Sequence, residues 1–263
     1  MGSESCQFLI PIKTEDKVKE ENIMLRNFRT SFIAIMLVLT VLSVQQVDAL
    51  SDNFEKDSGN WEVEVNPKGV LEKGNFGGWS IDKGIVAYDP AKGANSRMMT
   101  GKESWKDYTA ECDIKFLKAD NYPGGIRTYV DAKTGGHYAV WFYPKTKEIK
   151  LFSGTAWDIN VGIKELGVYT EKLYDAKVDV FYHVKVVHKG DQIEVWLGKS
   201  KDNTEKIIEA KDGKFKSGLF AFDGYNQPLH FDNFEINGPG ISAGTAVESQ
   251  DKLAIVWGTL KVK

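Results

Sequence analysis

GGIRTYVD at residues 124–131, AKTGG at 132–136 and HYAVWFYP at 137–144 form the stretch that decides the fold. Apolar and polar side chains alternate in both outer runs, and a Gly-containing turn joins them, so the stretch predicts a pair of antiparallel strands. Period two sorts the side chains onto two faces. The face expected to meet the core carries Ile126, Thr128, Val130, Tyr138, Val140 and Phe142. The other face mixes charge with large rings, as a surface that binds a sugar or another small polar ligand does, and carries Arg127, Tyr129, Asp131, His137, Trp141 and Tyr143.

Short alternating runs separated by turn residues continue along the rest of the chain. They are residues 61–65, 108–116, 148–154, 181–189, 192–199, 206–210, 217–224 and 229–236. Lys189-Gly190-Asp191 joins two of them with the chemistry of a tight hairpin. No run shows the period of a helix, and parallel strands would need crossover helices. The sequence therefore predicts an all-β protein, a two-sheet antiparallel sandwich.

Residues 1–49 are predicted to be a leader and a signal peptide. Basic residues precede an apolar run at residues 32–44, and the small-residue end Val47-Asp48-Ala49 follows it. This order is typical of a secretory signal, and the run is shorter than the ~20 residues of a membrane-spanning helix. We expect a secreted or periplasmic protein with no membrane partner after cleavage; an uncleaved anchor is the alternative. Met24 would open a signal peptide of ordinary length, so we expect translation to start there.

Residues 50–237 are predicted to form the folded domain, and residues 238–263 a linker and a short apolar tail. The tail sequence LAIVWGTL, residues 253–260, would pack back on the domain as a last strand or serve as an attachment segment. Cleavage leaves Cys112 as a single cysteine, which is expected to be a small buried side chain. A formal net charge of −3 gives no electrostatic footprint for nucleic acid.

The mature chain resembles the concanavalin A-like lectin/glucanase jelly roll, and within it the LamG-like domains and the 3-keto-disaccharide hydrolase family. The resemblance rests on motifs spread over nearly all of the mature domain. They are DNF (52–54), WSIDKGIV (79–86), YTAECDIKF (108–116), the opening pair, FYHVKVVHKGDQIEVWLGK (181–199), GLFAFDG (218–224) and FDNFEI (231–236). It implies a jelly-roll sandwich with its ligand on a sheet. Most of these motifs record strand and turn geometry, so they indicate the fold better than the activity.

Glycoside hydrolysis requires two carboxyl groups, ~5–5.5 Å apart for retention or ~6.5–9.5 Å apart for inversion. The glucanases of this fold present theirs from one strand as E-x-D-x-x-E or E-x-D-x-E. Here the nearest string is Glu111-Cys112-Asp113, and Lys115 and Phe116 stand where the second Glu would be. The sequence therefore lacks the complete catalytic set of a glucanase.

The 3-keto-disaccharide hydrolase resemblance implies cleavage of sugars that carry a ketone at C3. Elimination beside a ketone needs a base and a group that stabilises the enolate. Asp131 and His137 are the weak catalytic candidates, with Arg127 on the same predicted face; His183 is a further imidazole on a polar strand face. A surface role for His137 beside the turn is the alternative.

Binding alone requires less of the sequence. Aromatic rings stack on the C–H patches of sugars, and polar side chains pair with the hydroxyl groups. Packing beneath a loop is the alternative role for each ring. The candidate ligand-binding residues are Arg127, Tyr129, Trp141, Tyr143, Trp157 and Tyr225.

A structural Ca²⁺ is implied by the jelly-roll resemblance, between the first and last strands. Asp52 opens the first strand and Asp232 lies in the closing FDNF motif, and carboxylates are suitable ligands for Ca²⁺. Turn capping is the alternative role for both residues. The sequence has no His/Cys cluster for zinc, no G-x-S-x-G and no P-loop.

Three hypotheses follow for the mature chain. The first is a secreted carbohydrate-binding jelly roll, the second an extracytoplasmic hydrolase or lyase acting on 3-keto-glycosides, and the third a surface interaction module without a sugar ligand. We rank binding first because the sequence contains an aromatic and charged strand face, whereas its catalytic set is incomplete.

Overall fold

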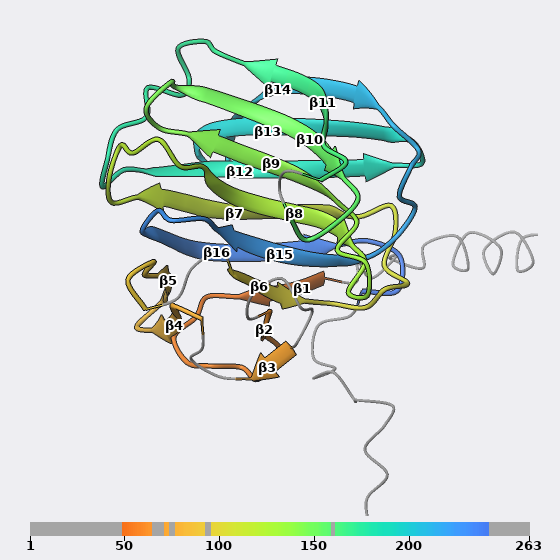
Figure 1. Ribbon diagram of the computed structural model, residues 1–263, viewed down its shortest axis with the longest axis horizontal. Helices are drawn as coiled ribbons and strands as arrows, with labels where there is room; N and C mark the ends of the chain where they lie inside the picture. Colours follow the sequence, from red (N-terminus) through yellow and green to blue (C-terminus); the bar gives the residue numbers. More distant parts are fainter. Residues whose placement is uncertain (1–48, 65–70, 74–76, 93–95, 159–160, 242–263) are drawn as a thin grey trace, which may run out of the picture. The chain divides into compact units, whose positions relative to one another are not determined.

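The computed structural model describes residues 49–64, 71–73, 77–92, 96–158 and 161–241. Within these residues, every element of regular secondary structure is a β-strand (Figure 1). Residues 1–48 of the predicted leader and residues 242–263 of the predicted C-terminal tail lie outside these residues. Within the described part, no helix is both long and apolar enough to span a bilayer.

The first layer, sheet A, has eight strands, all antiparallel to their neighbours. In spatial order they are β14 (Asn203–Lys211), β13 (Gln192–Ser200), β12 (Phe181–Lys189), β7 (Thr109–Phe116), β16 (Leu229–Asn237), β5 (Ile85–Tyr88) and β4 (Trp79–Asp82), with β1 (Ala49–Asp52) paired to β16. The predicted hairpin turn at Gly190, with φ of 62°, connects β12 and β13.

The second layer, sheet B, also has eight antiparallel strands. Their spatial order is β11 (Lys164–Tyr169), β10 (Glu148–Gly154), β9 (His137–Tyr143), β8 (Gly124–Val130), β15 (Leu219–Gly224), β6 (Ser96–Thr100), β2 (Glu62–Glu64) and β3 (Leu71–Lys73). The opening pair of the sequence is thus β8 and β9 in the middle of this sheet.

The two sheets lie face to face and enclose one large apolar core (Figure 1). Every second side chain of a strand enters it, so Ile126 of β8, Val140 of β9 and Phe222 of β15 are all buried there. Cys112 of β7 is free and buried in the same core, as predicted. The predicted all-β, two-sheet antiparallel jelly-roll sandwich is confirmed.

The predicted pairing of β8 with β9 is also confirmed, since Ile126 lies opposite Val140 and Arg127 opposite Ala139. The predicted alternation fails near the end of β8. Tyr129 has φ of 51°, and the register between β8 and β15 shifts at this position. An extra residue in one strand exchanges the two faces beyond it.

Tyr129 therefore lies in the main core instead of on the ligand face, and Val130 takes the opposite face. The Tyr129 ring stacks on His188 of β12 with 4.1 Å between ring centroids. Tyr108 Oη accepts a hydrogen bond from the Tyr129 backbone N–H at 2.8 Å. The Tyr129 hydroxyl accepts one from the Asp107 backbone N–H at 2.7 Å. These core contacts stabilise the left-handed backbone, which is unfavourable for a bulky residue.

We expect Tyr129→Phe to lower the free energy of unfolding by about 1 kcal/mol, because the Asp107 N–H loses its acceptor while the ring stays in place. Urea denaturation measures the effect. The matched control is Tyr122→Phe, whose side chain is exposed, with an expected change within about 0.5 kcal/mol. Equal stabilities of Tyr129→Phe and the wild type would contradict the structural role given to this hydroxyl.

Candidate functional site

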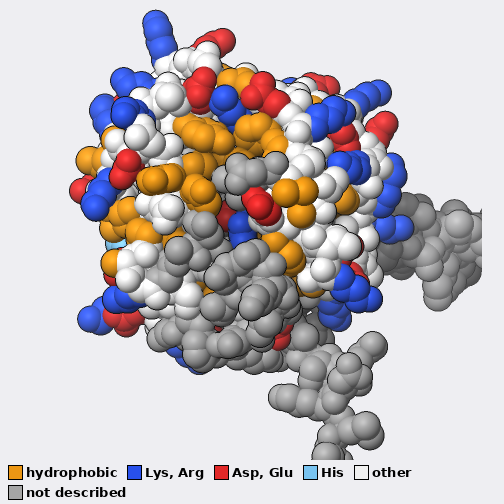
Figure 2. Space-filling view, viewed as in Figure 1, with side chains coloured by type: hydrophobic (Ala, Val, Ile, Leu, Met, Phe, Trp, Pro, Cys, Tyr) orange, Lys and Arg blue, Asp and Glu red, His pale blue; other side chains and the backbone are white. Residues whose placement is uncertain are grey.

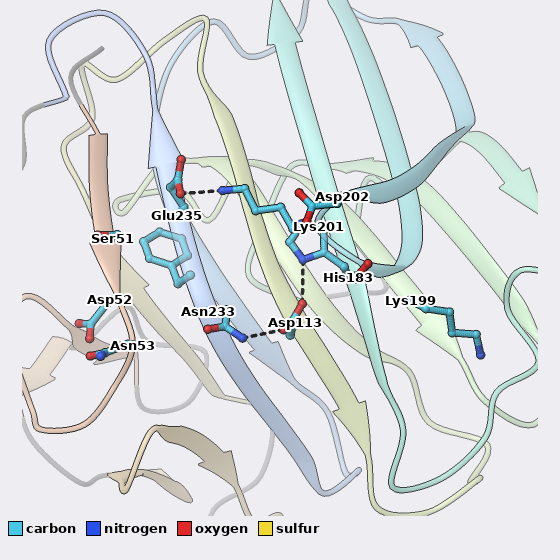
Figure 3. Close-up of a pocket in the computed structure, with 12 residues that line it drawn as sticks. Ser51, Asp52, Asn53, Asp113, His183, Lys199, Lys201, Asp202, Asn233 and Glu235 are labelled. Carbon is cyan, nitrogen blue, oxygen red and sulfur yellow. Dashed lines mark hydrogen bonds and ion pairs between the residues drawn. The ribbon is translucent and has the colours of Figure 1, made fainter. Parts of the chain in front are cut away.

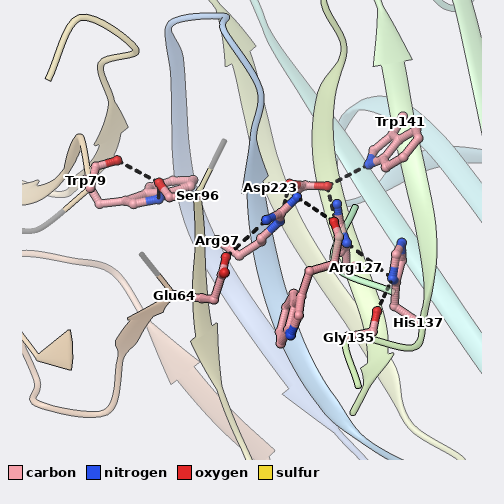
Figure 4. A network of polar contacts seen from close by, with 11 residues as sticks. Glu64, Trp79, Ser96, Arg97, Arg127, Gly135, His137, Trp141 and Asp223 are labelled. Atoms are coloured by element: carbon pink, nitrogen blue, oxygen red, sulfur yellow. Dashed lines mark hydrogen bonds and ion pairs between the residues drawn. The ribbon is translucent and has the colours of Figure 1, made fainter. Parts of the chain in front are cut away.

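The face of sheet B that points away from sheet A carries a row of polar side chains. Register places Glu64 beside Arg97, Arg97 beside Asp223, Asp223 beside Gly125, and Gly125 beside Trp141. Five neighbouring strands, β2, β6, β15, β8 and β9, each supply one residue. Since Gly125 has no side chain, the Trp141 indole and the Asp223 carboxylate meet above it (Figure 4).

Asp223 is the centre of this network (Figure 4). Its Oδ2 accepts hydrogen bonds from Arg127 Nε at 2.6 Å and from Trp141 Nε1 at 2.7 Å. Its Oδ1 lies 3.3 Å from Arg97 Nε. Arg97 Nη1 in turn donates to Glu64 Oε2 at 3.0 Å. All five side chains are buried, so the two carboxylates and the two guanidinium groups neutralise one another away from solvent.

His137, the first residue of β9, extends the network. Its Nδ1 lies 2.7 Å from the Gly135 carbonyl oxygen and 3.2 Å from Arg127 Nη1. A carbonyl can only accept, so the shorter contact places the proton on Nδ1 and leaves Nε2 with a lone pair. Burial, and next the Arg127 charge, lower the pKa of His137 to about 3. The imidazole is therefore neutral at pH 7.

Arg127 and Asp223 keep their charge at neutral pH. Burial, and next the charge of Arg97, lower the pKa of Arg127 to about 10, which still leaves the guanidinium protonated. Burial alone would raise the pKa of Asp223, but Arg127 and Arg97 outweigh it and hold that pKa below its ordinary value.

Apolar side chains flank the charged row on both sides. They form two small clusters, Met99, Val130, Trp157 and Ala221 on one side and Ala139, Trp141 and Phe152 on the other. The Arg97 guanidinium lies 5.8 Å from the ring of Trp157, and that of Arg127 lies 5.5 Å from the ring of Trp141. Figure 2 shows this face, with basic and acidic atoms set among apolar side chains.

Several buried polar atoms on this face have no hydrogen-bond partner among the described residues. They are Glu64 Oε1, Arg127 Nη2, His137 Nε2 and Trp157 Nε1. A buried polar group without a partner costs about 1–3 kcal/mol, so native proteins rarely keep several together. Donors and acceptors that remain unpaired beside indole rings are what a polar ligand would satisfy.

A family model described as the 3-keto-alpha-glucoside-1,2-lyase-like domain matches residues 50–237. The chain belongs to this family. A search of curated proteins gives no match.

Solved structures show the same fold at low identity. A prokaryotic β-1,3-1,4-glucanase (lichenase) derived from a mouse hindgut metagenome has a TM-score of 0.53 and 15% identity, covering 73% of this chain and 99% of its own. LamAcat from Zobellia galactanivorans has a TM-score of 0.51 and 13% identity, with 74% and 99% covered. The carbohydrate-binding module CBM66 from Bacillus subtilis has a TM-score of 0.50 and 20% identity, with 66% and 99% covered. The chain is thus a jelly roll of the concanavalin A-like lectin/glucanase type.

Within this 3-keto-alpha-glucoside-1,2-lyase-like domain, the structure brings four of the residues singled out from sequence onto one face: Arg127, His137, Trp141 and Trp157. Tyr143 lies at the end of the same face of β9, where Lys150 Nζ is 5.5 Å from its ring. Their roles in binding stay predictions.

The remaining predicted site residues lie elsewhere. Tyr129 is in the core because of the bulge described above. Asp131 caps its own turn, where Oδ1 accepts hydrogen bonds from the backbone N–H groups of Lys133 and Thr134, and the Thr134 bond lowers its pKa. Tyr225 packs against Tyr122 in a loop, with ring centroids 5.6 Å apart.

Sequence reasoning missed Glu64, Arg97 and Asp223. Arg97 precedes two methionines in the strand SRMMT, and Asp223 directly follows the apolar run LFAF. A charge within a strand that is otherwise buried was the available signal. The pairing partners are between 33 (Glu64 and Arg97) and 126 (Arg97 and Asp223) residues apart in the chain, so only the sheet register shows that these charges meet.

The predicted calcium site stays a prediction. Asp52 Oδ1 accepts a hydrogen bond from the Phe54 backbone N–H, and its Oδ2 accepts from Ser58 and Trp61 Nε1. These are the capping contacts of a turn. In the described residues, no three His, Cys, Asp or Glu side chains gather closely enough to hold a metal.

The carboxylates of the nearest glucanase-like string, Glu111 and Asp113, lie on sheet A, on the opposite side of the sandwich from the Asp223 network. His183 Nδ1 is 2.7 Å from Asp113 Oδ1, and its Nε2 is 3.5 Å from Glu111 Oε2. Burial alone would lower the pKa of His183, but these two carboxylates outweigh it and raise the pKa to about 9. Burial would raise the pKa of Glu111, whereas His183 and Lys201 bring it down to about 2.

We expect Asp223→Asn to destabilise the fold by about 3–5 kcal/mol, because it leaves buried guanidinium groups without their shared counter-charge. Chemical denaturation compares it with the wild type. Asp202→Asn, at an exposed position, is the matched control and should change stability by no more than about 0.5 kcal/mol. A loss below about 1 kcal/mol for Asp223→Asn would show that the network does not depend on this charge.

We expect His183 to make the free energy of unfolding depend on pH in the alkaline range. Its pKa is about 9 when folded and about 6.5 when unfolded, so its contribution is complete below pH 6.5 and is lost as pH rises through 9. The stability difference between wild type and His183→Gln should therefore shrink by about 1–2 kcal/mol from pH 6 to pH 10. His230→Gln is the control, since burial lowers that pKa and no such alkaline loss follows. A constant difference across this range would contradict the assignment.

Proposed function

We propose that this domain binds a carbohydrate on the outer face of sheet B, over the Asp223 network. The observation that carries the proposal is the set of buried polar atoms on Glu64, Arg127, His137 and Trp157 that have no partner among the described residues and lie beside two indole rings. Sugar hydroxyl groups both donate and accept, so one ligand class satisfies all four atoms. The C–H faces of a sugar ring suit the apolar clusters on either side.

The charge balance favours an uncharged sugar. Glu64 and Asp223 neutralise Arg97 and Arg127 within the network, and His137 is neutral at pH 7. A ligand with a net charge would find no excess counter-charge in this set. The compared structures support a carbohydrate ligand, because one is a carbohydrate-binding module and another is a β-1,3-1,4-glucanase.

Binding is favoured over catalysis by the protonation states. A general acid or base works best when its pKa lies near the working pH. His137, with a pKa of about 3, and Arg127, with a pKa of about 10, are both far from neutrality. The network is built to hold a ligand with fixed hydrogen bonds.

A second candidate function is cleavage of 3-keto-glycosides, which the family match favours. The free Arg127 Nη2 would donate a hydrogen bond to the ketone oxygen and stabilise an enolate there. His137 Nε2, with its lone pair, would accept the proton from the carbon beside the ketone. The low pKa of His137 makes it a weak base, so this function ranks below binding.

Export remains part of the proposal. The predicted signal peptide lies outside the described residues, and it supports a secreted or periplasmic protein that meets its ligand outside the cytoplasm. Nucleic acid and membrane stay outside the expected partners.

The test is retention on a panel of neutral oligosaccharides by residues 50–263. Trp141→Phe removes the indole N–H that donates to Asp223 together with part of the ring surface, and Arg127→Lys removes the guanidinium fork; each should weaken retention at least about tenfold. Trp196→Phe, at a tryptophan of sheet A, is the matched control and should bind like the wild type. Thermal melts of each variant separate lost binding from lost folding.

The same preparations are then given a 3-keto-disaccharide, and released sugar is measured. Release by the wild type that stops in His137→Gln would establish the second candidate function. Retention without release would leave binding alone. If no glycan is retained and no sugar is released, the carbohydrate proposal fails and an interaction module without a sugar ligand takes its place.

A further inference from the structure

A hollow lies on the outer face of sheet A, on the side of the sandwich opposite the Asp223 network (Figure 3). Its volume is about 680 Å³, enough for a small ligand. Strand β1 borders one side, β16 and β7 form the floor, and the β13–β14 turn borders the other side. Nearly all lining side chains are polar or charged, from Asp52 and Asn53 on β1 to Lys201 and Asp202 on the turn.

The floor depends on a bulge in β16. Asn233 has φ of 48°, and the register between β16 and β7 shifts here. Phe234 therefore turns into the core, while the Asn233 side chain stays on the outer face. Asn233 Nδ2 donates to Asp113 Oδ2 at 2.8 Å. The same Asp113 holds His183 through its other oxygen (Figure 3).

The turn side contributes two amines to the lining of the hollow. Lys201 Nζ pairs with Glu235 at 2.7 Å and also with Glu111. Lys199 Nζ is 3.6 Å from Asp175 and 4.8 Å from the Tyr182 ring. Figure 3 shows Lys199 apart from the cluster around Lys201.

Charge within the hollow is close to balanced. The carboxylates of Asp52, Asp113, Asp202 and Glu235 face the amines of Lys199 and Lys201 and the protonated His183. Donors and acceptors alternate across the floor. A ligand with a strong net charge gains little here, whereas hydroxyl groups, which both donate and accept, match both kinds of partner.

We propose that this hollow is a second binding site, which takes a neutral, hydroxyl-rich small molecule such as a sugar or an acyclic polyol. The site is independent of the sheet B proposal, since it shares no residue with it and lies on the other sheet. Two sites on opposite faces would let one domain bridge two ligand groups, which raises the apparent affinity for a ligand that presents both.

Site-resolved NMR on the isotope-labelled chain tests this, with glucose and sorbitol as the two probes. We expect millimolar additions to shift the side-chain amide signals of Asn53 and Asn233 and the ring signals of His183. Shifts with both probes indicate recognition of hydroxyl groups in general, and shifts with glucose alone indicate recognition of the sugar ring. No shift at these three residues with either probe would overturn the proposal.

Ser200→Trp would fill the hollow from its exposed rim and should weaken the effect on these signals at least about tenfold. Lys206→Ala is the matched control and should leave the effect unchanged, because that amine pairs with Glu194 and Glu209 and is not part of the lining of the hollow. An effect that survives Ser200→Trp would also overturn the proposal. Arg127→Lys should abolish only sheet B binding, so the two sites can fail separately.

Discussion

The buried carboxylate of Asp223 holds four strands of sheet B together. It accepts from Arg127 and Trp141 and pairs with Arg97, and Arg97 continues the chain of charge to Glu64. A buried ion costs several kcal/mol unless its partners are well placed. The strands beneath must therefore keep their register, and the same requirement fixes the positions of the side chains that would meet a ligand.

Two bulges with left-handed residues decide which side chains reach each surface. On β8, Tyr129 enters the core and Val130 emerges, which gives Trp157 an apolar surface to pack on. On β16, Asn233 stays outside and Phe234 enters the core. Each bulge thus removes a large ring from a surface, and a polar hollow or network lies beside it.

The network also explains why residue composition cannot distinguish a binding site from a catalytic site. The face predicted from sequence contained a guanidinium, an imidazole and a carboxylate, which together could form a catalytic set. In the fold, Asp131 is engaged by its own turn, and the carboxylate beside Arg127 is Asp223. The protonation states that result suit fixed hydrogen bonds better than proton transfer.

The sequence by itself determined the all-β class, the pairing of β8 with β9, and the placing of Arg127, His137 and Trp141 on one face. Period two and turn chemistry are local properties, so they can be read from the residues. Only the tertiary structure decided that Tyr129 turns inward, because its left-handed backbone depends on Tyr108 and His188 from other strands. It likewise decided that Arg127 meets Asp223, since pairing between residues far apart in the chain is set by how the strands are ordered in the sheet.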